Sequence, residues 1–271
     1  MQGRVLIIAG SDSGGGAGIQ ADIKACTALD AYAATAITAL TAQDTLGVHG
    51  VHPVPPDFIR QQIRLSLEDI GADVIKTGML GDTATIDAVC DALEAHGARL
   101  PVVVDPVMVA KGGHHLLAEA AVETLKRRLL PFASIITPNL PEAEVLAGMP
   151  VGSVEAMREA AGRLLALGVP AVLLKGGHLP GTRLVDLLAT PEGVETFESE
   201  RIETPHTHGT GCTLASAIAA GLAQGLGLRG AVARARAYVQ AALRTAPGLG
   251  KGHGPLNHAV TVDPARLATL A

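Results

Sequence analysis

Aromatic side chains are scarce in this sequence of 271 residues, which contains three Phe, two Tyr and no Trp. Proteins that bind single-stranded nucleic acid usually stack bases on aromatic rings. Basic runs are also lacking and the net charge is −5, whereas a phosphate backbone is bound by clustered Lys and Arg. The composition therefore argues against a nucleic-acid partner and favours a small molecule.

Cysteine is also rare. Cys26, Cys90 and Cys212 form no CxxC pair, which argues against a disulfide framework or a structural zinc site and fits a reducing cytosol. No uninterrupted apolar run approaches the roughly 20 residues that span a bilayer. The N-terminal "RVLIIAG" is short for a signal-peptide core and reads better as a strand. We expect a cytoplasmic protein without a membrane partner.

Apolar, β-branched segments alternate with helical patterns along the chain. The predicted strands are 4–10, 34–41, 73–78, 101–106, 133–138 and 171–177, and the predicted helices include 56–70 and 154–168. Strands that are apolar throughout, each followed by a helix, predict a mainly parallel sheet with helices on both faces. We find no linker and no repeat, so we predict one α/β domain over residues 1–271.

The pattern changes after Gly177. Segments 183–190 and 194–203 are separated by "PEG" and read as antiparallel edge strands. Two helices are predicted to follow, from about Gly211 and from about Leu228.

Glycines and polar residues follow each predicted central strand. The segments are "GSDSGGGAG", "TAQDTLG", "KTGMLG", "DPVMVAKGG", "PNLPEAE" and "KGGH". In parallel sheets, ligands bind at the carboxyl ends of the strands. These segments are therefore expected to meet in one site.

The segment "HGTGCT" (208–213) carries an anion-site pattern. Gly209 and Gly211 allow close approach of the backbone to a ligand, and the predicted helix start behind them favours phosphate. The helix dipole would also stabilise a Cys212 thiolate. An alternative is a tight strand-to-helix turn in which the cysteine only fills space.

The loop "GSDSGGGAG" (10–18) lacks the Gly-Lys-Ser/Thr of a Walker A loop and the spacing of a dinucleotide fingerprint. Its backbone either approaches a flat substrate or makes a flexible turn.

Charged side chains add to the predicted site. Asp105 ends an apolar strand, and Asn139 and Glu142 follow the next one. A carboxylate and an amide beside phosphates suit Mg²⁺, although a helix start also favours a residue such as Glu142. Lys175 follows a buried strand and is interpreted as a phosphate-binding lysine or as a surface lysine. Together these features indicate phosphoryl transfer without a P-loop, with Cys212 accepting the proton of the attacking hydroxyl.

Histidines invite a metal-site interpretation. Neither His114–His115 nor His206 with His208 has the i, i+4 spacing of a HExxH site. We therefore favour a role for His208 in orienting the "GTGC" loop.

The motif series resembles a known family. "AGSDSGGGAGIQADIKA", "TALTAQDTLGV", "IKTGMLG", "VVVDPVMVAKGG", "TPNLPEAE", "LLKGGH" and "THGTGCTLASAIAAGLA" occur in this order over roughly residues 5 to 225. The series is similar to the hydroxymethylpyrimidine/phosphomethylpyrimidine kinases of thiamine biosynthesis, in the ribokinase-like superfamily. Most of that superfamily ends its last motif in an Asp base, and the Cys212 variant is typical of the pyrimidine kinases and of related pyridoxal kinases.

The resemblance implies a ribokinase-like fold, a dimer, and an ATP- and Mg²⁺-dependent kinase that phosphorylates an aminopyrimidine alcohol and then its monophosphate. It implies catalytic roles for Cys212, Lys175, Gly209 and Gly211. It implies substrate contacts at Gln43, Met79, Val107, Gly10 and Asp22. It implies nucleotide contacts at Lys175, Asn139, Thr210 and Gly211, and metal ligands at Asp105 and Glu142. Asp44 departs from the Asn expected in "TAQNT" and leaves the fine substrate preference open.

Three alternatives remain at this point. A pyridoxal kinase would share the fold and the Cys base. A cysteine hydrolase would pair Cys212 with His206 or His208 but leave Lys175 and Asp105 unexplained. A non-catalytic nucleotide sensor would not need the full set of charged residues. We also predict that "AKGGHH" (110–115) is a mobile flap over the phosphates.

Overall fold

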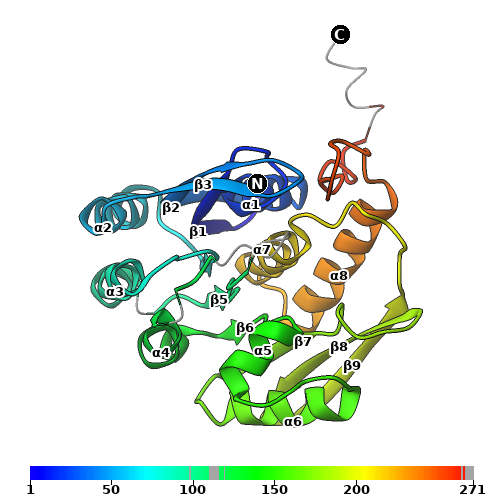
Figure 1. Cartoon of the computed structure of the whole chain (residues 1–271). Helices are drawn as coiled ribbons and strands as arrows, with labels where there is room; N and C mark the ends of the chain where they lie inside the picture. The colour runs from blue at the N-terminus through cyan, green and yellow to red at the C-terminus, as the bar shows by residue number, and fades with distance from the viewer. Residues whose placement is uncertain (98, 110–115, 119, 264, 266–271) are drawn as a thin grey trace.

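A nine-stranded sheet runs through the computed structural model of the chain, which describes residues 1–97, 99–109, 116–118, 120–263 and 265 (Figure 1). The strand order is β3-β2-β1-β4-β5-β6-β7-β8-β9. The parallel centre consists of β1 (Arg4–Asp12), β2 (Tyr32–Gln43), β4 (Val74–Thr77), β5 (Val102–Val104), β6 (Ile135–Ile136) and β7 (Val172–Lys175). The antiparallel strands are β3 (Val48–Pro53) at one edge and β8 (Arg183–Thr190) and β9 (Gly193–Glu200) at the other. The predicted mostly parallel sheet is confirmed.

Helices cover both faces of the sheet, as predicted. One face carries α2 (Pro56–Leu65), α3 (Thr83–Ala92), α4 (Ala121–Thr124), α5 (Leu140–Ala147) and α6 (Val154–Leu165). The opposite face carries α1 (Gly18–Ala28), α7 (Thr210–Ala223) and α8 (Leu228–Arg244). Among the described residues, no helix is long and apolar enough to cross a bilayer.

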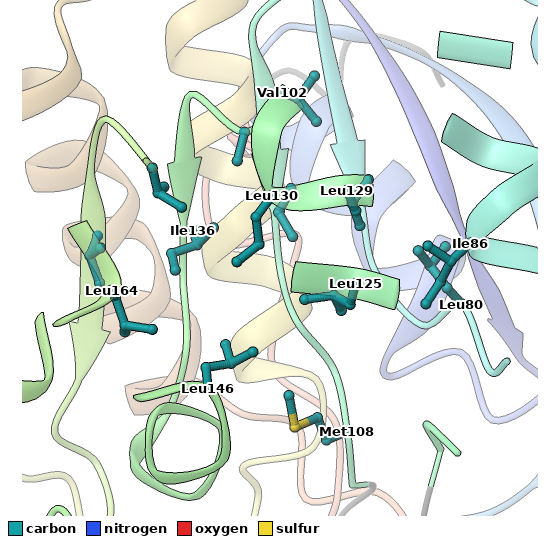
Figure 2. Packing of buried hydrophobic residues seen from close by; sticks show 14 of the residues in the cluster. Leu80, Ile86, Val102, Met108, Leu125, Leu129, Leu130, Ile136, Leu146 and Leu164 are labelled. Atoms are coloured by element: carbon teal, nitrogen blue, oxygen red, sulfur yellow. The ribbon is translucent and has the colours of Figure 1, made fainter. Parts of the chain in front are cut away.

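The core has two layers because successive strand residues point to opposite faces of the sheet. Leu6 and Ile8 of β1 pack on the α2–α6 side, whereas Val5 and Ile7 pack on the side of α1, α7 and α8. Figure 2 shows the first layer, in which leucine, isoleucine, valine and methionine side chains interlock. Since aromatics are so few, aliphatic side chains fill both layers, with many alanines in the layer of α1, α7 and α8.

Helix α7 is the central helix of its face. Its sequence, "TGCTLASAIAAGLA", is rich in small residues, and most of its side chains after Cys212 are buried. Small side chains let the neighbouring helices approach closely: a Cβ on Gly221 would lie 2.9 Å from the Cβ of Ala231 on α8. This packing fixes the axis of α7, and so fixes where its first turn lies.

The observed elements differ from the predicted ones mainly in length. The predicted strand 101–106 is reduced to β5, between Pro101 and Pro106, which have no N–H to donate to a ladder. Pro138 similarly follows the short β6. Helix α2 ends at Leu65 and continues as a π-helical turn over Ser66–Ile70. The sequence interpretation missed β3, whose residues are mostly exposed and lack an apolar run.

Candidate active site

Two glycine-rich loops meet at the start of α7. Gly209 precedes the helix with a φ of +80°, a left-handed conformation that glycine adopts without strain. A Cβ on Gly209 would overlap the carbonyl oxygen of Gly16, so the "HGTGC" loop packs directly on the "GSDSGGGAG" loop. No side chain caps the first N–H groups of α7, and such a helix start attracts anions. The two loops therefore build one site.

Lys175 and Asp105 meet beside this helix start. Lys175 ends β7, Asp105 follows β5, and the lysine Nζ lies 3.2 Å from the carboxylate Oδ1. Thr137, just past β6, donates from Oγ1 to the same oxygen at 3.2 Å. A Cβ on Gly211 would lie 3.3 Å from the Nζ of Lys175 and 3.6 Å from the Oδ2 of Asp105. An ammonium group, a carboxylate and the first turn of α7 thus converge.

The charge of Lys175 is well supported. Burial lowers the pKa of this lysine, but the nearby carboxylates of Asp105 and Glu142 outweigh it, and the pKa is raised overall. Lys175 is therefore positively charged at neutral pH, which suits it to hold phosphate oxygens.

Asn139 and Glu142 form a capping box at the start of α5. The Asn139 side chain accepts from the Glu142 N–H at 2.9 Å, and the Glu142 carboxylate accepts from the Asn139 N–H at 2.8 Å. Both residues therefore have a structural role, which was the alternative explanation for Glu142. Burial raises the pKa of Glu142 to about 7, while Lys175 lowers it and Asp105 raises it. Electrostatically, Glu142 belongs to the same cluster as Lys175 and Asp105.

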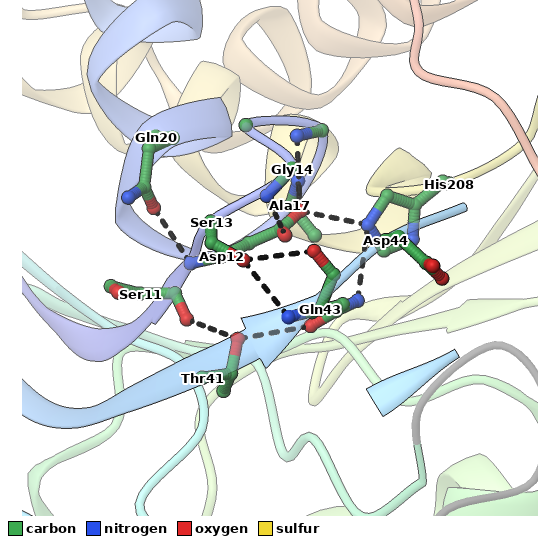
Figure 3. Close-up of polar contacts among 12 residues, drawn as sticks. Ser11, Asp12, Ser13, Gly14, Ala17, Gln20, Thr41, Gln43, Asp44 and His208 are labelled. Atoms are coloured by element: carbon green, nitrogen blue, oxygen red, sulfur yellow. Dashed lines mark hydrogen bonds and ion pairs between the residues drawn. The ribbon is translucent and has the colours of Figure 1, made fainter. Parts of the chain in front are cut away.

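At the opposite side of the site, Gln43 ends β2 beside His208 (Figure 3). His208 Nε2 lies 2.8 Å from Asp12 Oδ2 and 3.2 Å from Gln43 Nε2. The hydroxyl of Thr41 donates to the Ser11 carbonyl at 2.8 Å and lies 3.3 Å from Gln43 Oε1. The single Thr41 proton goes to the shorter contact at Ser11, and the Gln43 amide nitrogen carries two protons. The amide therefore keeps an acceptor oxygen and at least one N–H donor for a ligand.

Asp12 is the main residue of the site that the sequence interpretation missed. Its carboxylate accepts from the N–H groups of Gly14, Gly16 and Ala17 at 2.8, 3.0 and 2.8 Å. Burial raises the pKa of Asp12, but the hydrogen bonds from His208 and the backbone lower it more, so the carboxylate is ionised. Asp12 thereby shapes the "GSDSGGGAG" loop and holds His208 against it. An Asp just before a run of glycines is a known turn signal, and this signal in the sequence would have indicated the role of Asp12.

The predicted pocket residues Met79 and Gly10 are in contact. A Cβ on Gly10 would lie 2.8 Å from the Met79 Cε, so the absence of a side chain at Gly10 makes room for the methionine. Met79 is 9% exposed. Val107 is half-buried just past Asp105, where its N–H donates to the Asp105 carbonyl at 2.8 Å. These residues are placed at the carboxyl ends of β1, β4 and β5.

Asp22 requires a correction. It was predicted to contact the substrate, but its side chain is 0% exposed and both of its oxygens are within 2.9 Å of the Lys76 Nζ. Ser216 of α7 also donates to Oδ1, at 2.7 Å. With its acceptors satisfied inside the protein, Asp22 supports the site from behind and does not line it.

Cys212 lies in the first turn of α7, where its thiol was expected to gain stabilisation as a thiolate. The structure shows the opposite balance. Burial raises the pKa of the thiol to about 12, although Lys76 and the Gly18 N–H act to lower it. Cys212 is therefore a neutral thiol at pH 7 in this state of the site.

The histidines proposed for a hydrolase do not pair with Cys212. The ring of His208 contacts Asp12 and Gln43, and the buried Nδ1 of His206 has no hydrogen-bond partner among the described residues. In that described part of the chain, no group of three His, Cys, Asp or Glu side chains is placed to hold a metal ion. His114, His115 and the predicted flap (110–115) lie outside the described residues.

Comparisons with known proteins agree with this geometry. A family model described as phosphomethylpyrimidine kinase matches residues 12–257. The chain belongs to the phosphomethylpyrimidine kinase family. It is a phosphotransferase of the type that acts in thiamine biosynthesis, and the predicted ribokinase-like fold is confirmed.

Two curated relatives illustrate the match. The hydroxymethylpyrimidine/phosphomethylpyrimidine kinase of Salmonella typhimurium is 48% identical over 256 residues, which cover 93% of this chain and 96% of the relative. A thiamine biosynthesis bifunctional protein of Geobacter sulfurreducens is 54% identical over 265 residues, or 98% of this chain, but the chain spans only 54% of that longer protein.

Solved structures include both kinds of kinase. An ADP complex of Bacillus subtilis pyridoxal kinase superimposes with a TM-score of 0.90 at 39% identity, covering 97% of this chain and 100% of the other. A phosphomethylpyrimidine kinase of Clostridium difficile gives a TM-score of 0.78 at 40% identity, covering 88% and 97%. The backbone fits the pyridoxal kinase well, but the more identical curated relatives are pyrimidine kinases, which makes pyridoxal kinase the weaker interpretation.

Proposed function

We propose that this chain transfers the γ-phosphoryl group of ATP to the hydroxymethyl oxygen of 4-amino-5-hydroxymethyl-2-methylpyrimidine, and then phosphorylates the monophosphate to the diphosphate. The observation that carries the proposal is the convergence of Lys175, Asp105 and the first turn of α7 on one side of the site, with the Gln43 amide on the other. A homodimer and a cytoplasmic location remain predictions.

Phosphate binding is assigned to the α7 side. Lys175 provides a fixed positive charge, and Gly209, Thr210, Gly211 and Cys212 present the N-terminal backbone of α7 to the developing charge. Asn139 is assigned to the nucleotide. These groups are positioned before the ligand arrives, and positioning with charge stabilisation accounts for most of phosphoryl-transfer catalysis.

Asp105 and Glu142 fit a magnesium site. Both carboxylates are nearly fully buried, at 2% and 5% exposed, and both act on the pKa of Lys175. Mg²⁺ takes one or two carboxylates and completes its shell with water and phosphate oxygens, so this donor set suffices. A bound Mg²⁺ would neutralise charge on the phosphates.

The acceptor is assigned to the β1–β2 side. The Gln43 amide offers a donor and an acceptor in one plane, which matches an amino group beside a ring nitrogen. Met79, Val107 and Gly10 provide apolar contact to the ring. The hydroxymethyl group then points toward Cys212.

The proton balance involves Cys212. The hydroxyl oxygen forms a bond to the γ-phosphorus, the bond to the ADP oxygen breaks with its electron pair leaving on ADP, and the hydroxyl proton passes to the sulfur in its thiolate form, whose own proton has already left to solvent. Burial raises the pKa of this thiol to about 12, even with Lys76 acting to lower it. The role requires the thiolate form, which positive charge close to the sulfur favours.

A pyridoxal kinase is the second candidate, favoured by the TM-score of 0.90 to a pyridoxal kinase. Pyridoxal is also a flat nitrogen heterocycle with a hydroxymethyl group. The test is ADP release from MgATP with three acceptors in parallel: hydroxymethylpyrimidine, its monophosphate and pyridoxal. Turnover of both pyrimidines is expected, and turnover of pyridoxal alone would replace the proposal with its rival.

A further inference from the structure

A buried ion pair lies beneath the candidate active site. The Nζ of Lys76 on β4 is 2.9 Å from Oδ1 and 2.8 Å from Oδ2 of Asp22 on α1, and both side chains are 0% exposed. A Cβ on Gly78 would lie 3.0 Å from the same Nζ, so the glycine of "KTG" leaves room for the ammonium. The two charges are enclosed between the sheet, α1 and α7.

This pair is linked to the helix that carries Cys212 by a hydrogen bond between α1 and α7. Ser216 donates to Asp22 at 2.7 Å, and Cys212 lies four residues earlier on α7, on the same side of that helix. Gly18 lies four residues before Asp22 on α1, and its N–H acts to lower the pKa of the Cys212 thiol. The ion pair therefore lies one helical turn below the sulfur.

Stability alone does not explain this buried ion pair. Two buried charges lose their hydration, and replacing such a pair by apolar residues is often neutral or stabilising. Two separate segments, "QADIKA" and "IKTG", nonetheless supply the two charges, and a third, "TLASA", supplies the Ser216 that donates to Asp22. This cost is consistent with a role in the chemistry above it.

We propose that Lys76, held by Asp22, is a positioning residue that keeps positive charge beneath the Cys212 sulfur so that it accepts the substrate proton. The inference rests on the proposed function, because it assigns Cys212 the proton-accepting role. The cluster includes charges of both signs. Lys76 lowers the pKa of the thiol, whereas Asp22 and Asp105 raise it.

Two further titratable groups lie on the surrounding elements. Cys26 of α1 is buried with its Sγ 3.8 Å from the Ser216 carbonyl, and Lys175 at the end of β7 is electrostatically coupled to Cys212. Neither bonds the pair, so the contribution of the pair can be isolated by changing its two members separately.

The test measures the rate at which iodoacetamide alkylates Cys212 between pH 7 and 10, with the site identified by peptide mapping. Lys76→Met removes the positive charge, so the thiolate fraction at a given pH should fall about tenfold for each unit by which the thiol pKa rises. Asp22→Asn keeps the shape but removes the negative charge, and alkylation should become faster. We expect the alkylation rate to change in opposite directions in these two variants. Loosened packing alone would expose the thiol and make alkylation faster in both.

Cys26→Ala is the control, because it alters a buried neighbour of the pair without changing charge, and it should leave the alkylation profile in place. If Lys76→Met does not fold, the double variant Lys76→Met/Asp22→Leu removes both buried charges together. We expect that variant to fold and bind ADP but to turn over about tenfold more slowly, a smaller loss than the roughly 10²–10⁴-fold cost of removing a general base itself. Wild-type turnover with an unshifted pH profile would overturn the inference.

These measurements can contradict the role of Lys76 without contradicting the proposed kinase activity, and the reverse. Alkylation needs no acceptor, so an enzyme that turns over none of the three acceptors still reports on the charge beneath Cys212. Conversely, normal pyrimidine turnover with parallel changes in both single variants would leave the kinase assignment in place and remove the role of Lys76.

Discussion

At the scale of single residues, Cys212 is the group whose chemistry depends most on its surroundings. Cys212→Ala leaves the backbone of the α7 start and Lys175 in place, so ADP should bind as before. Turnover should fall about 10²–10⁴-fold, the usual cost of losing a general base. Isothermal titration with ADP and a coupled ADP-release assay measure the two effects.

Cys212→Ser supplies the matched control. A hydroxyl has nearly the shape of the thiol but is a far weaker proton acceptor, so this variant should resemble the alanine variant in turnover. If either variant retained near-normal turnover, the proton would have to pass elsewhere.

Gln43 tests the acceptor side. Gln43→Leu removes the amide while keeping a similar volume, and a bound aminopyrimidine would then lose both hydrogen bonds. We expect the KM for hydroxymethylpyrimidine to rise about tenfold or more, at about 1 kcal/mol for each lost hydrogen bond, with an unchanged KM for ATP. Thr41→Val is the control, because the Thr41 proton goes to Ser11. An equal rise in both KM values would contradict the assignment.

At the scale of elements, the junction of the two glycine-rich loops is open to a direct test. Gly209→Ala forces a Cβ into the Gly16 carbonyl and into a left-handed conformation, φ +80°. The α7 start must then shift away from the "GSDSGGGAG" loop, and turnover should fall at least about 100-fold, since small misplacements cost that much. Steady-state kinetics and thermal unfolding measure the outcome.

Gly225 is the matched control for this junction. It has nearly the same φ, +82°, but a Cβ there meets nothing within 4 Å. Gly225→Ala should cost about 1–2 kcal/mol of stability from the left-handed conformation alone and leave turnover intact. Similar losses of turnover in both variants would show that backbone strain, and not the loop contact, is responsible.

The elements also show what could be predicted from the sequence. Continuous apolar strands and the residues after them indicated the parallel sheet and the edge where Asp105, Lys175 and Gly211 meet. The limits had physical causes. Prolines shortened β5 and β6, and β3 has the composition of a loop because it is exposed at the edge of the sheet. Pairing with β2 makes it a strand, and a contact of that kind is not encoded in local periodicity.

At the scale of the whole molecule, the site depends on contacts between segments far apart in the chain, which no sequence motif predicts. Lys251 and Gly252 donate their N–H groups to the Thr45 hydroxyl at 3.1 and 3.2 Å, across more than 200 residues. His208 donates its N–H to the Gly254 carbonyl at 3.1 Å. The C-terminal segment thus ties the β2–β3 turn to the "HGTGC" loop. The pKa of Cys212 was mispredicted for a related reason, because burial depends on the whole fold whereas the helix dipole is local.

The same C-terminal segment predicts how stability depends on pH. His258 lies 2.9 Å from the Thr213 hydroxyl, next to Cys212, and its carbonyl accepts from Tyr238 at 2.8 Å. Burial lowers the pKa of His258 to about 4, with a smaller effect from Lys24. Between pH 6.5 and about 4, His258 is protonated in the unfolded chain but stays neutral in the folded protein, so the unfolded state binds one proton more. The contribution of His258 to stability is therefore complete above pH 6.5 and is lost as the pH falls through this window.

Denaturant unfolding at pH 7 and pH 5 measures this effect. The wild-type protein should lose about 2 kcal/mol from this group between the two values, because one pKa unit corresponds to about 1.4 kcal/mol. His258→Gln keeps a polar group near Thr213 without titrating, so its loss over the same interval should be smaller by that amount. His253→Gln, at an exposed position of the same segment, should keep the wild-type slope. If His258→Gln and His253→Gln lost stability in parallel with the wild type, burial of His258 would not govern the acid sensitivity of this fold.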